Sequence, residues 1–236
     1  VQKFTSEGVF VSKWGTAGTG DGQFSYPYDI TVAPDGSVYV VEHGNNRIQK
    51  FTSDGTFVRK WGSNGTADGK FKNAVDVAVA PDGSVYVADW NNKRIQKFDS
   101  AGGFLLKWDM SYKPTGVAVA PDGSVYVSCK TCNSIQKFDS AGGFLLEWGE
   151  SGHGDGQFNQ PYGVAVAPDG SVYVAYWKKT RIQKFDSAGG FVIKWGQGDP
   201  PGSSFANSRG VAVAPDGSVY VTEFNGDSVQ KWSVGP

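Results

Sequence analysis

The sequence has little of several residue types that mark common functional classes. Its 236 residues include two cysteines, two histidines and one methionine, and the formal net charge is −1. With only His43 and His153, a zinc site of three histidines is excluded. The near-zero charge gives no global field that would favour nucleic acid or an anionic membrane. No apolar run approaches the roughly 18 residues that span a bilayer.

Known catalytic signatures are also missing. Neither a Gly-x-Ser-x-Gly elbow nor a phosphate-binding loop occurs. The two cysteines form one Cys-x-x-Cys stretch, Cys129 to Cys132, without the second ligand pair that zinc would need. We expect either a local disulfide or two free thiols there. A chain that starts at Val1 with neither methionine nor signal peptide is expected to be an excised domain, a processed chain or an engineered sequence.

What the chain has in abundance is repetition. The stretch Ala-Pro-Asp-Gly-Ser-Val-Tyr-Val occurs five times at intervals of 47, 40, 47 and 47 residues, with its proline at Pro34, Pro81, Pro121, Pro168 and Pro215. A fixed period of this size indicates a repeat architecture. The 33 glycines fit many short strands joined by tight turns. We expect one domain over residues 1–236.

The second repeat predicts four strands, named A to D here. They cover residues 75–80, 84–88, 94–98 and 104–108. Pro81-Asp82-Gly83 is turn chemistry between the first two. The stretch 94–98, Arg-Ile-Gln-Lys-Phe, alternates polar and apolar residues as a half-buried strand does. Each repeat is therefore a four-stranded antiparallel meander, which is the blade of a β-propeller.

The predicted fold is an all-β propeller of five four-stranded antiparallel blades. The last blade lacks a D strand, and residues 9–14 are expected to supply it, so that the N- and C-terminal strands close the ring. Residues 1–4 and 229–232 both resemble strand C, and only one can occupy that blade. The D strands end in one tryptophan each, expected to pack neighbouring blades: Trp14, Trp61, Trp108, Trp148 and Trp195.

The repeated segments Gly-Val-Ala-Val-Ala-Pro-Asp-Gly-Ser-Val-Tyr-Val, Asn-Asn-x-Arg-Ile-Gln-Lys-Phe and Gly-Asp-Gly-Gln-Phe resemble the NHL repeat family. The resemblance covers nearly the whole chain. It implies a propeller, most often six-bladed, that binds proteins or RNA, and in some relatives lyase or hydrolase chemistry. The shortage of histidines argues against the metal lyases among related propellers. The near-identity of the blades indicates recent duplication or engineering.

The two ends of the blades differ in how much they vary. In a meander the A–B and C–D turns lie at one end of the sheet, and these turns are almost invariant between repeats. The B–C turns and D–A loops lie at the other end and diverge, and the D–A loop before the third blade is seven residues shorter than the others. We call this second end the variable face and expect function there, the alternative being drift on an unconstrained surface.

Two sets of residues on the variable face are candidate sites. The B–C tips carry aromatics that could stack on a sugar or anchor a protein, or merely cap neighbouring loops: Trp90, Trp177, Tyr176, Phe224 and His43. The starts of the A strands, at the mouth of the predicted channel, carry Asp29, Asp76, Arg209, Tyr28 and Tyr162. The second set could hold a divalent cation or a polar ligand, or provide acid–base chemistry. Its alternative is a salt bridge lining a wet channel.

The charges of the variable face look balanced. Its basic residues are Arg47, Arg94, Arg181, Lys93, Lys178 and Lys179. Its acidic residues are Glu42, Asp89, Glu223 and Asp227. An RNA-binding face would need a larger positive surplus.

Function is expected to be binding or scaffolding, for a protein or a small polar or carbohydrate ligand, by a monomer without membrane or nucleic-acid contact. Two alternatives remain open. The chain could be an engineered or duplicated array of repeats with no specific ligand. It could also be a lyase- or hydrolase-like enzyme using the carboxylates at the channel mouth. No cofactor is expected other than that divalent cation.

Overall fold

The computed structural model describes residues 1–176, 181–196, 205 and 207–233. Within them the chain is β-strand and turn, with one 3₁₀ turn at Trp90–Asn92. The chain divides into two compact units, Val1–Lys107 and Trp108–Pro236, and the boundary falls within a strand.

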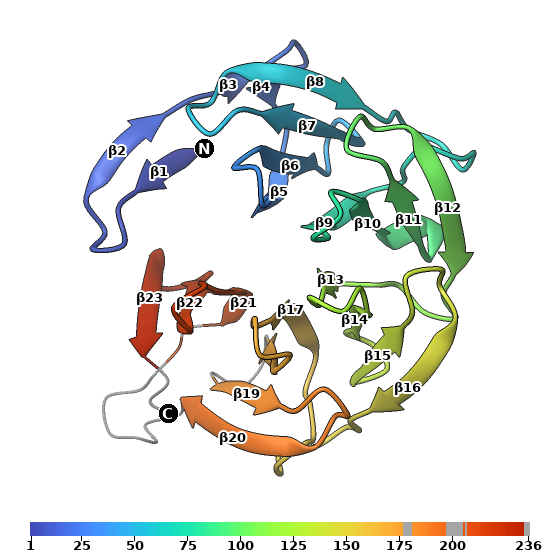
Figure 1. The fold of residues 1–236 in the computed structure, drawn as a ribbon, viewed down its shortest axis with the longest axis vertical. Coiled ribbons are helices and arrows are strands. Elements are labelled where there is room, and N and C mark those ends of the chain that lie inside the picture. Colours follow the sequence, from blue (N-terminus) through green and yellow to red (C-terminus); the bar gives the residue numbers. More distant parts are fainter. Residues whose placement is uncertain (177–180, 197–204, 206, 234–236) are drawn as a thin grey trace. The chain divides into compact units, whose positions relative to one another are not determined.

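The predicted all-β propeller fold is confirmed, and its blades are antiparallel meanders in sequence order (Figure 1). Blade 1 consists of β5 (Pro27–Val32), β6 (Val38–Glu42), β7 (Arg47–Phe51) and β8 (Phe57–Trp61). Blade 2 consists of β9 (Ala74–Val79), β10 (Val85–Asp89), β11 (Arg94–Phe98) and β12 (Phe104–Asp109). Blade 3 consists of β13 (Gly116–Val119), β14 (Val125–Cys129), β15 (Ser134–Phe138) and β16 (Phe144–Trp148). Blade 4 consists of β17 (Pro161–Val166), β18 (Val172–Tyr176), β19 (Arg181–Phe185) and β20 (Phe191–Gly196). Blade 5 consists of β21 (Ser208–Val213), β22 (Ser218–Glu223) and β23 (Ser228–Ser233).

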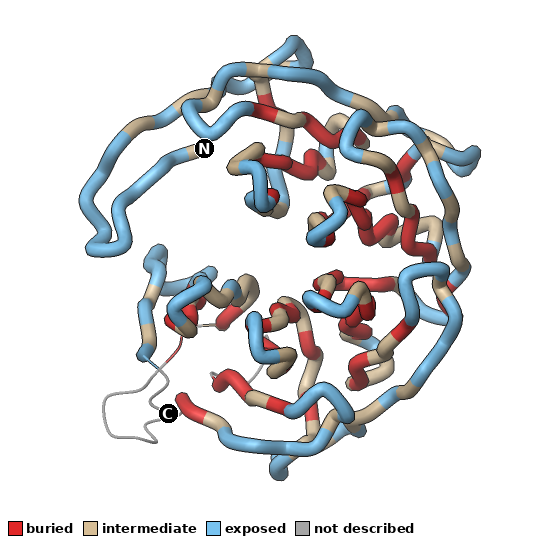
Figure 2. The backbone as a smooth tube through the Cα atoms, in the orientation of Figure 1, coloured by how far each residue is buried: buried red, intermediate tan, exposed pale blue. Residues whose placement is uncertain are grey.

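The burial of each strand follows its place in the sheet. All five residues of β6, β10, β14 and β18 are buried, because strand B is covered on both faces. In the D strands, exposed residues either alternate with half-buried ones or predominate; in β12 every second residue is exposed. Figure 2 shows that burial falls from the B strands to the D strands. The Val-Tyr-Val stretch therefore supplies the core that packs between consecutive blades of a unit.

The Pro-Asp-Gly turns are fixed by their own side chains. Asp82 Oδ1 accepts the Ser84 N–H at 2.8 Å, and Gly83 adopts φ +83°. This Asx-type turn needs a carboxylate and a residue free to adopt positive φ. The Ser84 N–H bond lowers the pKa of Asp82. The same hydrogen bond recurs in the four other blades, between Asp35 and Ser37, Asp122 and Ser124, Asp169 and Ser171, and Asp216 and Ser218.

The tryptophan that ends a D strand packs on the C–D turn of the next blade. An added Cβ at Gly102 would lie 2.7 Å from Cδ2 of Trp61, and Gly102 has φ +80°. Glycine is therefore required there both by the close approach and by the backbone conformation. The same contact joins Gly55 to Trp14, Gly142 to Trp108 and Gly189 to Trp148. The predicted role of these tryptophans in packing neighbouring blades is confirmed for these pairs.

The pairing of the N-terminal strands differs from the prediction. Strand β2 (Phe10–Lys13) pairs with β1 (Gln2–Phe4), and β23 ends a three-stranded sheet. Both candidates for strand C are thus strands, each in its own sheet, and no described pairing gives β2 to blade 5. A hairpin between neighbours in sequence closes a short loop, which costs little chain entropy. The D–A loop before blade 1 holds a short parallel pair, β3 (Thr16–Ala17) and β4 (Gln23–Phe24).

Candidate binding face

A buried arginine ties the B–C turn of blade 2 to the D–A loop before it. Arg94 Nε donates to Asp89 Oδ2 at 2.8 Å. Its Nη atoms donate to three loop carbonyls, those of Thr66 at 2.8 Å, Ala67 at 3.0 Å and Lys70 at 2.7 Å. Asp89 is fully buried and Arg94 is 3 % exposed. A buried ion pair is tolerated when further hydrogen bonds satisfy both ions, as they do here.

Two amide side chains complete this arrangement, which we call the arginine network. Gln96 donates to the Lys70 carbonyl at 2.8 Å and accepts the Gly69 N–H at 3.0 Å. Asn92 Nδ2 donates to Asp89 Oδ2 at 2.8 Å. The network fixes turn and loop as one unit, which gives the variable face a rigid base.

Blades 1 and 4 repeat the network. In blade 1 its members are Glu42, Asn45, Arg47 and Gln49. In blade 4 the hydroxyl of Tyr176 takes the place of the carboxylate and accepts a hydrogen bond from Arg181 Nε. Arg181 also donates to the carbonyls of His153 at 2.7 Å and Gly154 at 2.9 Å. Burial raises the pKa of the Tyr176 hydroxyl well above its usual range.

Several residues that the sequence analysis placed on the surface of the variable face are buried in the arginine network. Arg47, Arg94 and Arg181 are 3–6 % exposed, so they add no surface charge. Tyr176 is fully buried, which places it in the network and not among the side chains a ligand could contact. The signal that could have revealed the network is the five-residue spacing between Glu42 or Asp89 and the following arginine.

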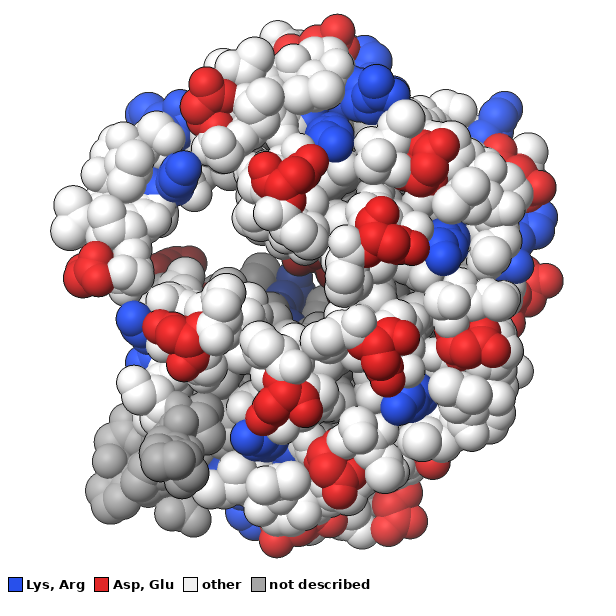
Figure 3. Space-filling view, viewed as in Figure 1, with Lys and Arg blue, Asp and Glu red and all other residues white. Residues whose placement is uncertain are grey.

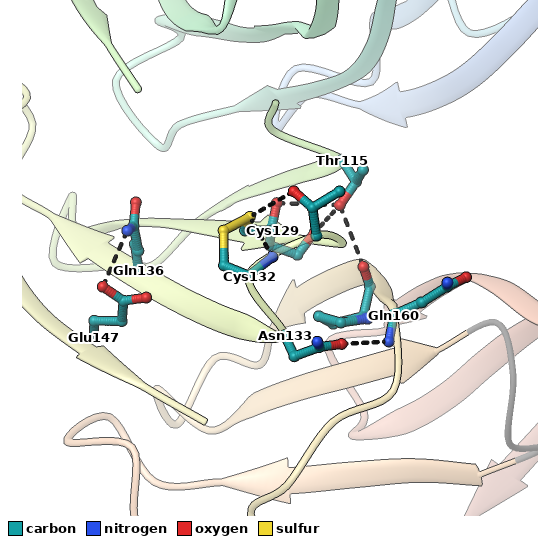
Figure 4. The surroundings of a disulfide bond; sticks show 10 residues. Thr115, Cys129, Cys132, Asn133, Gln136, Glu147 and Gln160 are labelled. Carbon is teal, nitrogen blue, oxygen red and sulfur yellow. Dashed lines mark hydrogen bonds between the residues drawn. A yellow bond between two sulfur atoms is a disulfide. The ribbon is translucent and has the colours of Figure 1, made fainter. Parts of the chain in front are cut away.

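Blade 3 lacks the network and carries a disulfide instead. Cys129 and Cys132 are bonded across the B–C turn (Figure 4). Cys129 is 2 % exposed, and the Cys132 N–H donates to its Sγ at 3.1 Å. Ser134 stands where blades 1, 2 and 4 have arginine.

In the first unit, aromatic and amide side chains gather on the variable face. The rings of Tyr28 and His43 stack with centroids 5.4 Å apart and planes at 28°. Asn73 Nδ2 lies 3.0 Å from His43 Nε2, and Asn91 donates to Asn73 Oδ1 at 2.6 Å. Burial lowers the pKa of His43, which favours the neutral ring. Trp90 is half-buried at the start of the 3₁₀ turn.

In the second unit, a guanidinium lies against two aromatic rings. Arg209 Cζ is 4.0 Å from the ring centroid of Phe224 and 5.4 Å from that of Tyr162. Lys130 Nζ is 5.9 Å from the Tyr162 ring. Phe224 remains 53 % exposed. The cluster offers both apolar ring surface and positive charge to solvent. Trp177, the remaining aromatic of the candidate set, lies outside the described residues.

The candidate carboxylates Asp29 and Asp76 lie together in the first unit. Oδ2 of Asp29 and Oδ1 of Asp76 both accept the Val77 N–H, at 3.1 and 3.0 Å. Burial raises the pKa of Asp29, while hydrogen bonds from the Asp76 side chain and the Val77 amide act in the opposite direction. Two carboxyl groups this close favour sharing one proton. Arg209 and Tyr162 of the same candidate set lie in the second unit.

Asp29→Asn is expected to stabilise the protein at neutral pH. Because the folded-state pKa of Asp29 is raised, its contribution to stability is fully present below the ordinary aspartate pKa and is lost as the pH rises through the raised value. The melting temperature of the variant should therefore be higher than that of the wild type at neutral pH. At acidic pH the two melting temperatures should be nearly equal. Asp82→Asn is the control of opposite sign, because the folded-state pKa of Asp82 is lowered. Thermal melts at several pH values test this, and a wild type that melts higher at neutral pH would contradict it.

Two of the blades match a known repeat. The family model for the NHL repeat matches residues 24–51 and 71–98, which run from the start of the A-strand region to the end of strand C in blades 1 and 2. Blades 1 and 2 therefore carry NHL repeats. A comparison with curated proteins found no match.

Solved structures share the fold of this chain at low sequence identity. One is a catalytically inactive virginiamycin B lyase from Staphylococcus aureus with quinupristin. It is 15 % identical in sequence and superposes with a TM-score of 0.69, and the match covers 99 % of this chain and 73 % of that one. Another is a streptogramin B lyase, 16 % identical in sequence, with a TM-score of 0.66. That match covers 90 % of this chain and 70 % of the lyase chain. At such identities the likeness shows the fold alone.

Among the described residues, no three His, Cys, Asp or Glu side chains come together as a metal site would require. In that same part of the chain, no helix has the length and apolar character to cross a membrane. On the face in view in Figure 3, acidic and basic side chains are interspersed.

Proposed function

We propose that the chain is a binding module whose ligand contacts the variable face. The observation that carries the proposal is the cluster of Arg209, Phe224 and Tyr162, in which a cation lies on aromatic rings that remain partly open to solvent. These positions differ from blade to blade, whereas the repeated positions build the blades. Their variation therefore suits recognition more than folding.

The chemistry of the variable face favours a polar ligand with a flat or ring-shaped surface. Aromatic rings bury the apolar face of such a ligand, and side chains with polar tips orient it. Tyr28, His43 and Trp90 in the first unit have the same mixed character. A carbohydrate, or a protein surface presenting rings and polar groups, fits this description.

A thermal-shift screen tests the proposal. Oligosaccharides, divalent metals and short RNAs would be screened against the wild type, Trp90→Ala and Phe224→Ala. Phe144→Ala is the matched control, because Phe144 is 59 % exposed on a D strand. A ligand at a hundred times its dissociation constant adds about 2.7 kcal/mol to stability. We expect a shift that a face variant loses and Phe144→Ala keeps. A shift unaffected by either face variant would contradict the proposal, and no shift at all would favour an array of repeats without a ligand.

A second candidate function is acid–base chemistry at the carboxyl pair. It is favoured by Asp29 and Asp76 sharing one amide donor and by the pKa of Asp29, which burial raises, as suits a group that must hold a proton. The structural likeness to two streptogramin-type lyases makes elimination the reaction to assay first. Turnover of quinupristin by the wild type, lost in Asp29→Asn/Asp76→Asn, would support it. Turnover that survives in the double variant would refute it.

A further inference from the structure

The third blade replaces the arginine network position by position. Cys129 pairs with Ser134 in the same register in which Asp89 pairs with Arg94 and Glu42 with Arg47. Residues directly opposite each other on antiparallel strands place their side chains on the same face of the sheet. Cys129 therefore occupies the carboxylate position and Ser134 the arginine position.

The disulfide replaces the link that asparagine makes elsewhere. In blade 2, Asn92 follows Asp89 by three residues and donates to its carboxylate. In blade 3, Cys132 follows Cys129 by three residues and bonds to its sulfur. The D–A loop before blade 3 is seven residues shorter, so an arginine at position 134 would lack the loop carbonyls that Arg94 uses. A covalent bond thus holds the turn where the loop is absent.

The Ser134 hydroxyl is buried and unsatisfied. Ser134 is 2 % exposed, and its Oγ has no hydrogen-bond partner among the described residues. In blade 5 a serine at the same register, Ser228, donates to Glu223 at 2.9 Å. An unsatisfied buried hydroxyl in a native fold calls for an explanation. A charged acceptor on Cys129, in place of the Glu223 carboxylate, would supply the missing partner.

We propose that Cys129–Cys132 is a thiol–disulfide exchange site whose co-reactant is a dithiol. A thiolate of the dithiol attacks Cys132 Sγ, a mixed disulfide forms, and the bond to Cys129 breaks with its electron pair left on Cys129 Sγ. The second thiol of the reductant then attacks the mixed disulfide and releases Cys132. Two protein thiols form, carrying the two protons of the dithiol, and the dithiol is oxidised to its own disulfide.

The surroundings assign the two sulfurs different roles. Cys132 is half-buried at the turn, whereas Cys129 is 2 % exposed, so Cys132 is the sulfur an incoming thiolate reaches. The Cys132 N–H at 3.1 Å already points to Cys129 Sγ, and Ser134 is opposite. Hydrogen bonds to a thiolate lower its pKa and make it a faster leaving group. A bond that closes so short a loop removes little entropy from the unfolded chain, so its opening should lower the free energy of unfolding only slightly.

Opening the disulfide would affect the variable face through Lys130. This residue lies between the two cysteines in the turn, with Nζ 5.9 Å from the Tyr162 ring. Reduction loosens the turn that positions it. This consequence rests on the proposed binding function, whereas the exchange chemistry does not.

Reduction of the native protein by dithiothreitol, followed by alkylation and mass spectrometry, tests the exchange site. We expect both cysteines to be alkylated while the protein stays folded by circular dichroism. Ser134→Ala should slow reduction about two- to tenfold, the range of one lost hydrogen bond, without lowering the melting temperature of the oxidised protein. Resistance of the disulfide until the protein unfolds would overturn the proposal, and so would a wild-type rate in Ser134→Ala.

The single-cysteine variants test the assignment of the two sulfurs. Cys129→Ser leaves the thiol of Cys132, and Cys132→Ser leaves that of Cys129. With glutathione disulfide as the probe, the first variant should form a mixed disulfide at least about tenfold faster, because reactivity follows access. The reverse order would overturn the assignment. Neither readout depends on ligand binding, so failure of the binding proposal would leave both results intact.

Discussion

Arg94→Met is expected to lower the free energy of unfolding by about 3–5 kcal/mol, the usual cost of breaking a buried ion pair from one side. The variant keeps much of the side-chain volume but leaves Asp89, which is fully buried, without its cation. It also frees the loop carbonyls of Thr66, Ala67 and Lys70. Urea unfolding at neutral pH measures the change.

Blade 4 provides a matched control for this prediction. Arg181→Met frees loop carbonyls in the same way, but the partner it leaves is the neutral hydroxyl of Tyr176. The expected loss is about 1–3 kcal/mol, that of unsatisfied buried polar groups. The difference between the losses of unfolding free energy in the two variants measures the cost of leaving the buried Asp89 carboxylate without a cation. Equal losses would show that the buried charge of Asp89 is not what makes Arg94 necessary.

Trp61→Ala is expected to cost about 3 kcal/mol, the lower end of the range for removing a large aromatic side chain from a core, because Trp61 is partly buried against that core. Its indole packs against Phe98 and Tyr39, with ring centroids 6.0 and 6.1 Å away, and under the backbone of Gly102. Alanine would leave a cavity between blades 1 and 2 that Gly102 has no side chain to fill. Thermal and urea unfolding measure the loss.

Trp61→Phe separates ring packing from hydrogen bonding. The indole Nε1 of Trp61 is buried and has no hydrogen-bond partner among the described residues. Phenylalanine keeps most of the ring and gives up no hydrogen bond, so its cost should stay below about 1.5 kcal/mol. A loss as large as that of alanine would mean that the shape of the indole, and not its burial, decides stability.

The sequence was sufficient to predict the parts of the fold that depend on local chemistry. The Asp-Gly turns recur because Asp82 bonds to Ser84 and Gly83 adopts positive φ, and both requirements can be read from residue types. Strand order follows from a meander with short turns. The D-strand tryptophans could be assigned to blade packing because one occurs per repeat in the same register.

The candidate site was less predictable because it depends on contacts between distant segments. Arg94 donates to carbonyls 24 to 28 residues earlier in the chain. Because the sequence does not show such distant partners, Arg94 was predicted to be an exposed charge of the variable face. Tyr176 looked like an exposed aromatic because its role depends on Arg181 being buried beside it. The pairing of β2 with β1 was missed because residues 1–4 and 229–232 are nearly identical and either could serve. For Cys129 and Cys132, spacing alone left a disulfide and two thiols open, and the structure has the disulfide.

Recognition is expected to use the variable face and to leave the repeated turns uninvolved. Hydrogen–deuterium exchange with and without the strongest hit of the thermal-shift screen tests it most directly. We expect slower exchange in the B–C turns at 43–46, 90–93 or 224–227, and unchanged exchange in the Pro-Asp-Gly turns at 34–36, 81–83 and 215–217. Protection confined to the Pro-Asp-Gly turns would contradict it.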